Sequence, residues 1–246
     1  MNSDVKSLLT DLQKINEDNT ISIRVPSINK KASFKLINVS QQKKLLTSAL
    51  EGFDGVIKRT NILNSILFDN CVNDVEFLIV DRSAVLLALR KEIIGADITI
   101  KDTTYSLDNL EPFDMSSIEL ASSVEYDNIK INLKVPTLKI DTEVNSKIEK
   151  EFLKLESQED KIKHSLDLVI SYETSKYIES VYVGEHTITF DDISPYERRI
   201  VVDNLPLALN NKILEYIEPI KKAIDNTLQV ADEVIVEIDA SFLTPD

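Results

Sequence analysis

The sequence predicts an α+β fold, in which mixed hairpins and helices at the N-terminal end precede an acidic, mainly helical C-terminal part. Several long segments place apolar residues at three- and four-residue steps, which is typical of amphipathic helices. Several short segments alternate apolar and polar residues between turn residues, which is typical of strands and hairpins. The two patterns are mixed without a repeat period. We place the change of pattern after Pro136 and predict two regions, 1–136 and 137–246.

The first predicted element is an amphipathic helix over residues 3–16. Its apolar residues share one face, whereas the opposite face is polar and charged. A terminal amphipathic helix packs on its own domain or docks on a neighbour, because chain termini are often loosely held. The apolar face consists of Val5, Leu8, Leu9, Leu12 and Ile15.

The rest of the N-terminal region alternates hairpins with helices. Alternating residues in 21–25 and 32–36 predict a hairpin that turns at Pro26–Asn29. The further expected elements are a helix from a Ser40 cap to Glu51, a turn at Asp54–Gly55, a helix from 57 to 71, a helix from an Asp81 cap to Ile94–Gly95, strands at 98–100 and 129–135, and a loop-rich stretch over 102–128.

The C-terminal region reads as helices around one hairpin. Ser194-Pro195-Tyr196-Glu197 is the clearest helix start, because a capping serine, a proline and a glutamate occupy the positions that favour it. The other expected elements are a helix carrying Val144, Ile148, Phe152 and Leu155, a helix from Ser157–Asp160 through Ile170, a hairpin at 180–190 turning at Gly184–Glu185, a long helix from Ile213 to Leu228 with Pro219 inside, and a final strand at 234–238.

The composition is that of a soluble globular protein of 246 residues, with 43% apolar and 28% charged residues. No segment approaches the roughly 18 uninterrupted apolar residues of a membrane helix. The N-terminus lacks the basic and apolar segments of a signal peptide, so we expect a cytosolic protein. Cys71 is the only cysteine, which excludes disulfides and thiolate zinc sites within one chain. The four glycines are scattered, which weakens any phosphate-cradling loop.

The net charge of −14 is unevenly placed along the chain. Residues 1–100 hold 13 Lys and Arg against 12 Asp and Glu, a net charge of +1, whereas residues 101–246 hold 15 against 30, a net charge of −15. An acidic region of this size repels a phosphate backbone, so we expect no nucleic-acid binding. The acidity favours solubility, and a second interpretation is that it faces a basic protein surface.

The sequence contains no phosphate-binding, nucleophile-elbow or zinc-protease motif. His164 is interpreted as a solvated helix residue and His186 as part of a polar turn, because two histidines are too few for a metal site. Cys71 is interpreted as a small buried hydrophobe, since the nearby Asp69 and Asp74 disfavour a thiolate. We therefore predict no catalytic residue, no cofactor and no metal. The many carboxylates leave one enzymatic alternative, a hydrolase with an unfamiliar carboxylate site.

The order of segments resembles the baseplate hub protein family of T-even-like contractile-tailed phages. The resemblance spans nearly the whole chain and is carried by three segments: Val25-Pro26 with Phe34-Lys35-Leu36, Asp81-Arg82 with Leu86 and Leu89-Arg90 through Gly95, and Asp239-Ala-Ser-Phe-Leu243. Some relatives carry a paired-cysteine knuckle after the strand that follows the second segment. Here Ile100–Tyr105 holds no cysteine, so the resemblance implies no structural zinc.

The resemblance implies a non-enzymatic role in building a phage tail hub through contacts with other hub proteins or the tape-measure protein. It places the chain in the host cytoplasm during assembly and in the virion tail baseplate afterwards. The alternative is an assembly chaperone that acts on the hub or the tape measure and then leaves. Self-association is left open. In residues 81–95 the resemblance implies structure alone, with Asp81 as a cap, Leu86 and Leu89 packed, and Arg82 and Arg90 paired with acids.

For partner binding we single out the two ends of the chain. Leu8, Leu9 and Leu12 lie on the first predicted helix. Phe242 and Leu243 lie in a tail that follows the last predicted strand, where an exposed aromatic can insert into a partner groove. The competing interpretation is that Phe242 packs on its own domain, since burial of an aromatic is as useful in a core as at an interface.

Overall fold

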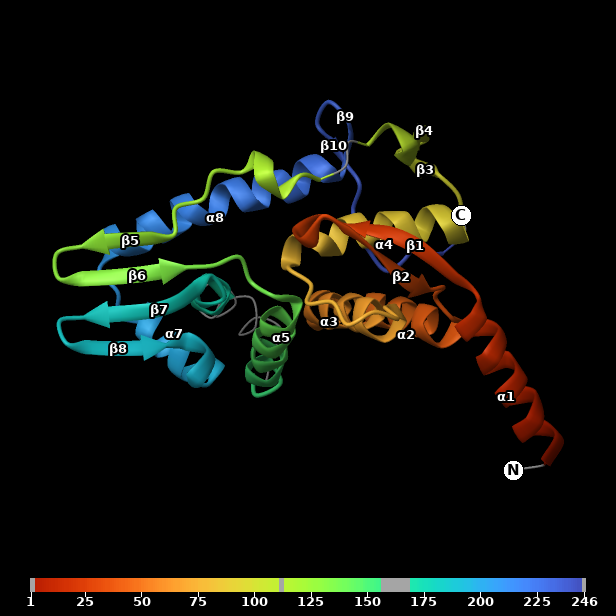
Figure 1. The fold of residues 1–246 in the computed structure, drawn as a ribbon, viewed down its shortest axis with the longest axis horizontal. Coiled ribbons are helices and arrows are strands. Elements are labelled where there is room, and N and C mark those ends of the chain that lie inside the picture. The colour runs from red at the N-terminus through yellow and green to blue at the C-terminus, as the bar shows by residue number, and fades with distance from the viewer. Residues whose placement is uncertain (1–2, 111–112, 156–168, 245–246) are drawn as a thin grey trace.

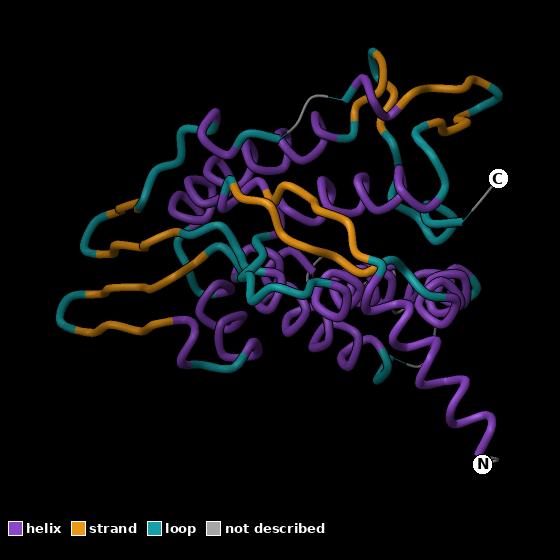
Figure 2. The backbone as a smooth tube through the Cα atoms, turned by 45° about the vertical axis from the view of Figure 1, so that its right-hand side comes forward, coloured by secondary structure: helices purple, strands orange, loops and turns teal. Residues whose placement is uncertain are grey.

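The computed structural model describes residues 3–110, 113–155 and 169–244, and it confirms the α+β fold (Figures 1 and 2). The predicted helix from Ser157 through Leu166 lies outside the described residues, whereas residues 169–175 are helical. The principal helices are α1 (Ser3–Asp18), α2 (Val39–Ala49), α3 (Gly52–Asn70), α4 (Ile79–Ile93), α5 (Leu138–Phe152), α7 (Pro195–Asp203) and α8 (Leu207–Thr227). The strands are β1 (Thr20–Val25), β2 (Lys30–Lys35), β3 (Asp97–Ile100), β4 (Thr103–Ser106), β5 (Ser123–Tyr126), β6 (Ile129–Leu133), β7 (Ile178–Val183), β8 (His186–Thr189), β9 (Gln229–Ala231) and β10 (Val234–Ile235).

The strands form one antiparallel sheet of four, in the order β5-β6-β7-β8, and three separate hairpins. β1 pairs with β2 as the predicted hairpin around the turn at Pro26–Ile28, and β7 pairs with β8 around Gly184. The stretch expected to be loop-rich contains two strands. β4 pairs with β3, and β5 pairs with β6, so each belongs to a hairpin. The last strand is shorter than predicted, since β10 pairs only at Val234 and Ile235.

Two predicted helix caps differ in the structure. The first turn of α2 is capped by Asn38, whose side chain accepts a hydrogen bond from the Gln41 amide at 3.0 Å, and not by Ser40. α4 begins after Leu78, so Asp81 lies inside its first turn; its carboxylate accepts from the Leu78 amide at 2.8 Å. Both carboxamide and carboxylate caps satisfy amides that a helix start leaves free.

Asp54–Gly55 lies inside α3 and not in a turn. A Cβ on Gly55 would come within 1.9 Å of the Ser48 carbonyl oxygen. Gly55 is therefore needed for close approach of α3 to the end of α2, a role that sequence alone does not distinguish from a turn.

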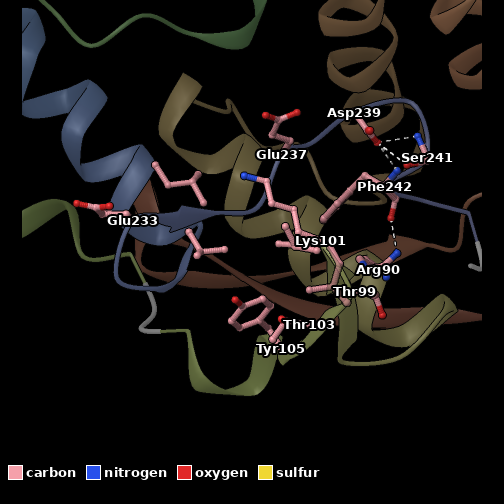
Figure 3. A pocket seen from close by; sticks show the side chains of 14 residues that line it. Arg90, Thr99, Lys101, Thr103, Tyr105, Glu233, Glu237, Asp239, Ser241 and Phe242 are labelled. Atoms are coloured by element: carbon pink, nitrogen blue, oxygen red, sulfur yellow. Dashed lines mark hydrogen bonds between the residues drawn. The ribbon is translucent and has the colours of Figure 1, made fainter.

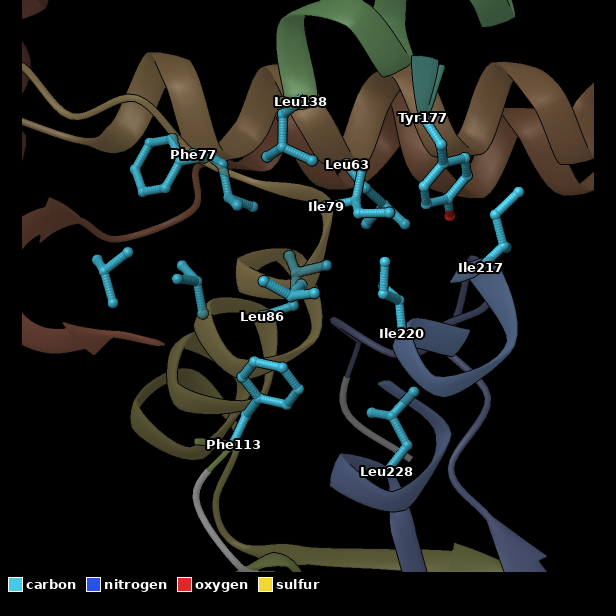
Figure 4. Packing of buried hydrophobic residues seen from close by; sticks show 14 of the residues in the cluster. Leu63, Phe77, Ile79, Leu86, Phe113, Leu138, Tyr177, Ile217, Ile220 and Leu228 are labelled. Atoms are coloured by element: carbon cyan, nitrogen blue, oxygen red, sulfur yellow. The ribbon is translucent and has the colours of Figure 1, made fainter. Parts of the chain in front are cut away.

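The main core crosses the predicted boundary after Pro136. β6 pairs with β7, and α8 lies beside β5, where Lys212 donates to the Glu125 carbonyl at 2.7 Å (Figure 1). Figure 4 shows α3, α4, the start of α5 and α8 contributing apolar side chains to one cluster. The division into regions 1–136 and 137–246 thus remains a description of sequence character, while strand pairing and packing connect the two regions. The labelled members of the cluster are Leu63, Phe77, Ile79, Leu86, Phe113, Leu138, Tyr177, Ile217, Ile220 and Leu228.

Candidate interaction surfaces

Helix α1 projects from the rest of the chain and leaves its apolar face uncovered. Both views show it extending away from the body beyond β1 (Figures 1 and 2). The ion pair between Glu17 and Lys35 of β2, at 4.0 Å, is at its C-terminal end. We call the five residues of the apolar face the α1 stripe; their exposed fractions are Val5 43%, Leu8 57%, Leu9 43%, Leu12 47% and Ile15 60%. Leu8, Leu9 and Leu12 are therefore exposed to solvent, and their contact with a partner stays a prediction.

The C-terminal segment has the opposite arrangement. Phe242 and Leu243 are only 3% and 2% exposed, because the segment returns to the body and packs in the main core. The expectation of an exposed aromatic anchor at Phe242 was therefore wrong for this chain as folded. The interpretation in which Phe242 packs on its own domain is the one the structure shows.

Arg90 of α4 holds this segment in place (Figure 3). Its guanidinium donates to the Phe242 carbonyl oxygen at 2.6 Å and to the Asp97 carbonyl oxygen at 3.1 Å, and it lies 5.4 Å from the centre of the Phe242 ring. The Asp239 carboxylate turns the chain by accepting from the amides of Ser241 and Phe242, at 2.8 and 3.0 Å. Arg90 is buried, so its hydrogen bonds and cation–π contact act in a desolvated setting.

An open hollow of about 710 Å³ lies between this segment and the β3–β4 hairpin (Figure 3). Tyr105 and Lys101 line it from the hairpin, and Glu233 and Glu237 line it from the opposite side. The walls are mixed in chemistry, and the most buried charged group, Arg90, is already bonded to backbone carbonyls. The hollow is therefore an open depression in the surface and does not bring reactive groups together.

A buried ionic cluster at Asp141 joins α3, α4 and α5 to the turn that holds Lys176. Its carboxylate is 2.7 Å from the Lys176 ammonium and 2.7 Å from the Arg82 guanidinium, and it accepts from the Asn64 amide at 2.9 Å. Arg82 thus pairs with an acid, as the resemblance implies. Burial raises the pKa of Asp141, but the charges of Lys176 and Arg82 and the hydrogen bonds outweigh this and lower the pKa to about 2. Helical periodicity could not reveal this cluster, because Lys176 is distant in sequence and its burial depends on the fold.

The chemistry of the buried carboxylates does not favour the hydrolase alternative. Asp141 is held ionised by two cations, which suits a structural ion pair better than a general acid. Burial raises the pKa of Asp81, yet its oxygens are already engaged by the amide and hydroxyl of Ser27, at 2.8 and 2.7 Å, and by the Leu78 amide. Both carboxylates are therefore committed to joining helices and loops.

The remaining candidate ligands are dispersed. His186 is exposed in β8, and His164 lies outside the described residues. Cys71 is partly buried, and burial raises the pKa of its thiol, which disfavours a reactive thiolate. Within residues 3–110, 113–155 and 169–244, no three His, Cys, Asp or Glu side chains are grouped as metal ligands. In the same part of the chain, no helix is both long and apolar enough to cross a membrane.

Comparison with known proteins gives one family. No curated protein and no solved structure matched the chain. A family model described as T4 bacteriophage base plate protein matches residues 18–237, from the last residue of α1 to the segment before the buried C-terminal end. The match includes the β1–β2 hairpin, α4 and α8, which carry much of the core. Because the match covers most of the chain, this protein belongs to the T4 bacteriophage base plate protein family and has a structural role in a phage baseplate.

Proposed function

We propose that this chain is a non-enzymatic component of the baseplate hub that acts through protein–protein contacts. It would meet its partners in the host cytoplasm during assembly and remain in the tail baseplate of the virion. The observation that carries this proposal is the uncovered α1 stripe on a member of a baseplate family. An isolated protein gains nothing from holding five apolar side chains in water on one helix face, whereas a component of an assembly can bury them against a neighbour.

Within this proposal, Leu8, Leu9 and Leu12 are the contact residues. They extend from the molecule on a helix that another protein can reach without rearrangement of the body (Figure 1). Phe242 and Leu243 support the function indirectly, because they attach the C-terminal segment to α4 and to the core. Other hub proteins and the tape-measure protein are the partners we propose.

Coexpression tests this proposal directly. The tagged chain is expressed with each hub protein and with the tape-measure protein of the same phage, and copurifying protein is quantified. Leu8→Gln with Leu12→Gln removes apolar contact area while keeping good helix formers. The matched control is Leu50→Gln with Leu207→Gln, two leucines that are 87% and 74% exposed elsewhere on the surface.

We expect at least one of these proteins to copurify with the chain and with the control, and to be lost from the α1 variant. Failure of every hub and tape-measure protein to copurify would contradict the proposed function. Equal retention by both double variants would keep the hub role but remove α1 as its contact. Mass spectrometry of purified virions then tests persistence: absence of the chain from mature particles would replace a resident component with an assembly chaperone.

A further inference from the structure

Four of the five residues of the α1 stripe have the layout of a short coiled-coil seam with one acidic border. Val5 and Leu12 are seven residues apart, as are Leu8 and Ile15, which gives two heptads of alternating three- and four-residue steps. The positions immediately before Val5 and Leu12, and the equivalent position one heptad later, are all aspartate. These three residues, which we call the acidic row, are Asp4, Asp11 and Asp18.

The acidic row lies along one side of the stripe, because residues seven apart in a helix share the same side. Asp11 and Asp18 are exposed. On the other side of the seam the equivalent position is Leu9, which adds an apolar side chain and no charge. A partner helix that covers the stripe therefore passes aspartates on one side and an apolar residue on the other.

A second copy of this chain does not complement that pattern. In an antiparallel pair the acidic rows face each other, which places aspartate against aspartate. In a parallel pair each acidic row faces the side of the seam that carries Leu9 in the other copy, which offers no positive charge. Either arrangement covers the apolar residues but sets no positive charge of the second copy against Asp11 and Asp18.

Packing of the apolar face of α1 against a partner would also stabilise the helix itself. It has 16 residues, near the length at which isolated helices are marginal in water, and most helices in proteins are stabilised by packing of an apolar face. Its last turn contains Glu17 and Asp18 and no basic residue, an unfavourable arrangement at the negative end of the helix dipole. Positive charge from a partner near this end would offset that cost.

We infer that the α1 stripe is covered by an amphipathic helix of another protein, whose apolar seam is bordered by lysine or arginine residues that face the acidic row. This inference rests on the proposed function and specifies the chemistry of the partner. The family match begins at Asp18, so nearly all of α1 lies outside the part of the chain that carries the family likeness. The helix is thus an element through which this chain selects its own neighbour.

Two synthetic peptides provide the test with the full chain. Both contain the same three heptads with an Ile and Leu seam; one has lysine at the positions bordering the seam, and the other has glutamate. Binding of each labelled peptide is measured by fluorescence anisotropy at low and high salt. The test variant is Asp11→Lys with Asp18→Lys. The matched control is Asp225→Lys with Asp232→Lys, which changes the net charge equally at two other exposed aspartates.

We expect the chain and the control variant to bind the lysine peptide about ten-fold or more tightly than the glutamate peptide, with a preference that weakens as salt screens it. The D11K/D18K variant should prefer the glutamate peptide. If L8Q/L12Q binds neither peptide, the peptides bind the wild-type chain at the α1 stripe. Equal binding of both peptides, or no reversal in D11K/D18K, would overturn the inference.

Sedimentation of the full chain adds an independent outcome. A dimer that L8Q/L12Q dissociates would show that a second copy covers the stripe, which would also overturn the inference. The coexpression experiment separates this failure from failure of the proposed function. A partner that is lost with L8Q/L12Q but retained by D11K/D18K would leave the hub role and the α1 contact intact and remove only the basic border.

Discussion

The two ends of this chain carry similar apolar residues and lie in opposite environments. Leu8 and Leu12 at the N-terminal end are about half exposed, whereas Phe242 and Leu243 at the C-terminal end are buried in the core. The difference lies in what each end meets: the C-terminal segment finds Arg90, which binds its backbone, while α1 leaves the body without a covering element (Figure 1). Apolar character by itself therefore does not determine burial in this chain, which depends on whether the fold supplies a covering element.

The largest expected effect is at the buried end. Phe242→Ala removes a core aromatic and its contact with Arg90, so we expect the free energy of unfolding to fall by about 3–5 kcal/mol. Urea denaturation measures this change. Leu243→Ala and Leu207→Ala are a matched pair of the same substitution. The free energy of unfolding should fall more in the first, because Leu243 is 2% exposed and Leu207 is 74% exposed. A Phe242→Ala protein as stable as the wild type would show that the C-terminal segment is not part of the core.

The second-largest expected effect is at the buried Asp141 cluster, whose contribution to stability depends on pH, unlike that of the exposed leucines of α1. The folded-state pKa of Asp141 is lowered from 3.8 to about 2, so its contribution to stability is present above pH 4 and is lost as the pH falls toward 2. That shift corresponds to about 2 kcal/mol. We expect Asp141→Asn to destabilise the protein at pH 7, because Lys176 then stays buried without its counter-charge.

The deficit of Asp141→Asn relative to the wild type should shrink by about 2 kcal/mol between pH 5 and pH 2, as the wild-type carboxylate becomes protonated. Denaturation curves of both proteins across this range measure the difference. A deficit that stays constant would mean that Asp141 has an ordinary pKa and does not depend on its two cations.

The smallest expected effect on stability is at α1. L8Q/L12Q should change the free energy of unfolding by no more than about 0.5 kcal/mol, because both leucines are already exposed and glutamine favours helix. Thermal and urea denaturation of the wild type, L8Q/L12Q and the control L50Q/L207Q measure the change in the free energy of unfolding. A loss as large as that in Phe242→Ala would show that α1 packs on the body and would remove the contrast between the two ends.

The sequence allowed prediction of what depends on local patterns. The capping box at Ser194, the end of α4 just before Gly95 and the hairpin turning at Gly184 follow from nearby residues alone. The prediction of a turn at Gly55 is wrong, because glycine is needed there to make room for the neighbouring α2, which the local sequence does not reveal. The burial of Lys176 and Phe242 likewise depends on distant residues, Asp141 and Arg90, which no spacing rule connects.

The most direct test of α1 as a docking surface is hydrogen–deuterium exchange of the full chain, alone and in complex with the coexpressed hub or tape-measure protein. Docking predicts that amides of α1 exchange rapidly in the free chain and are slowed about ten-fold or more in the complex, while amides of the buried C-terminal segment are protected in both. Unchanged exchange across residues 3–18, with new protection elsewhere, would contradict the assignment of α1 as the surface through which this baseplate protein binds its partner.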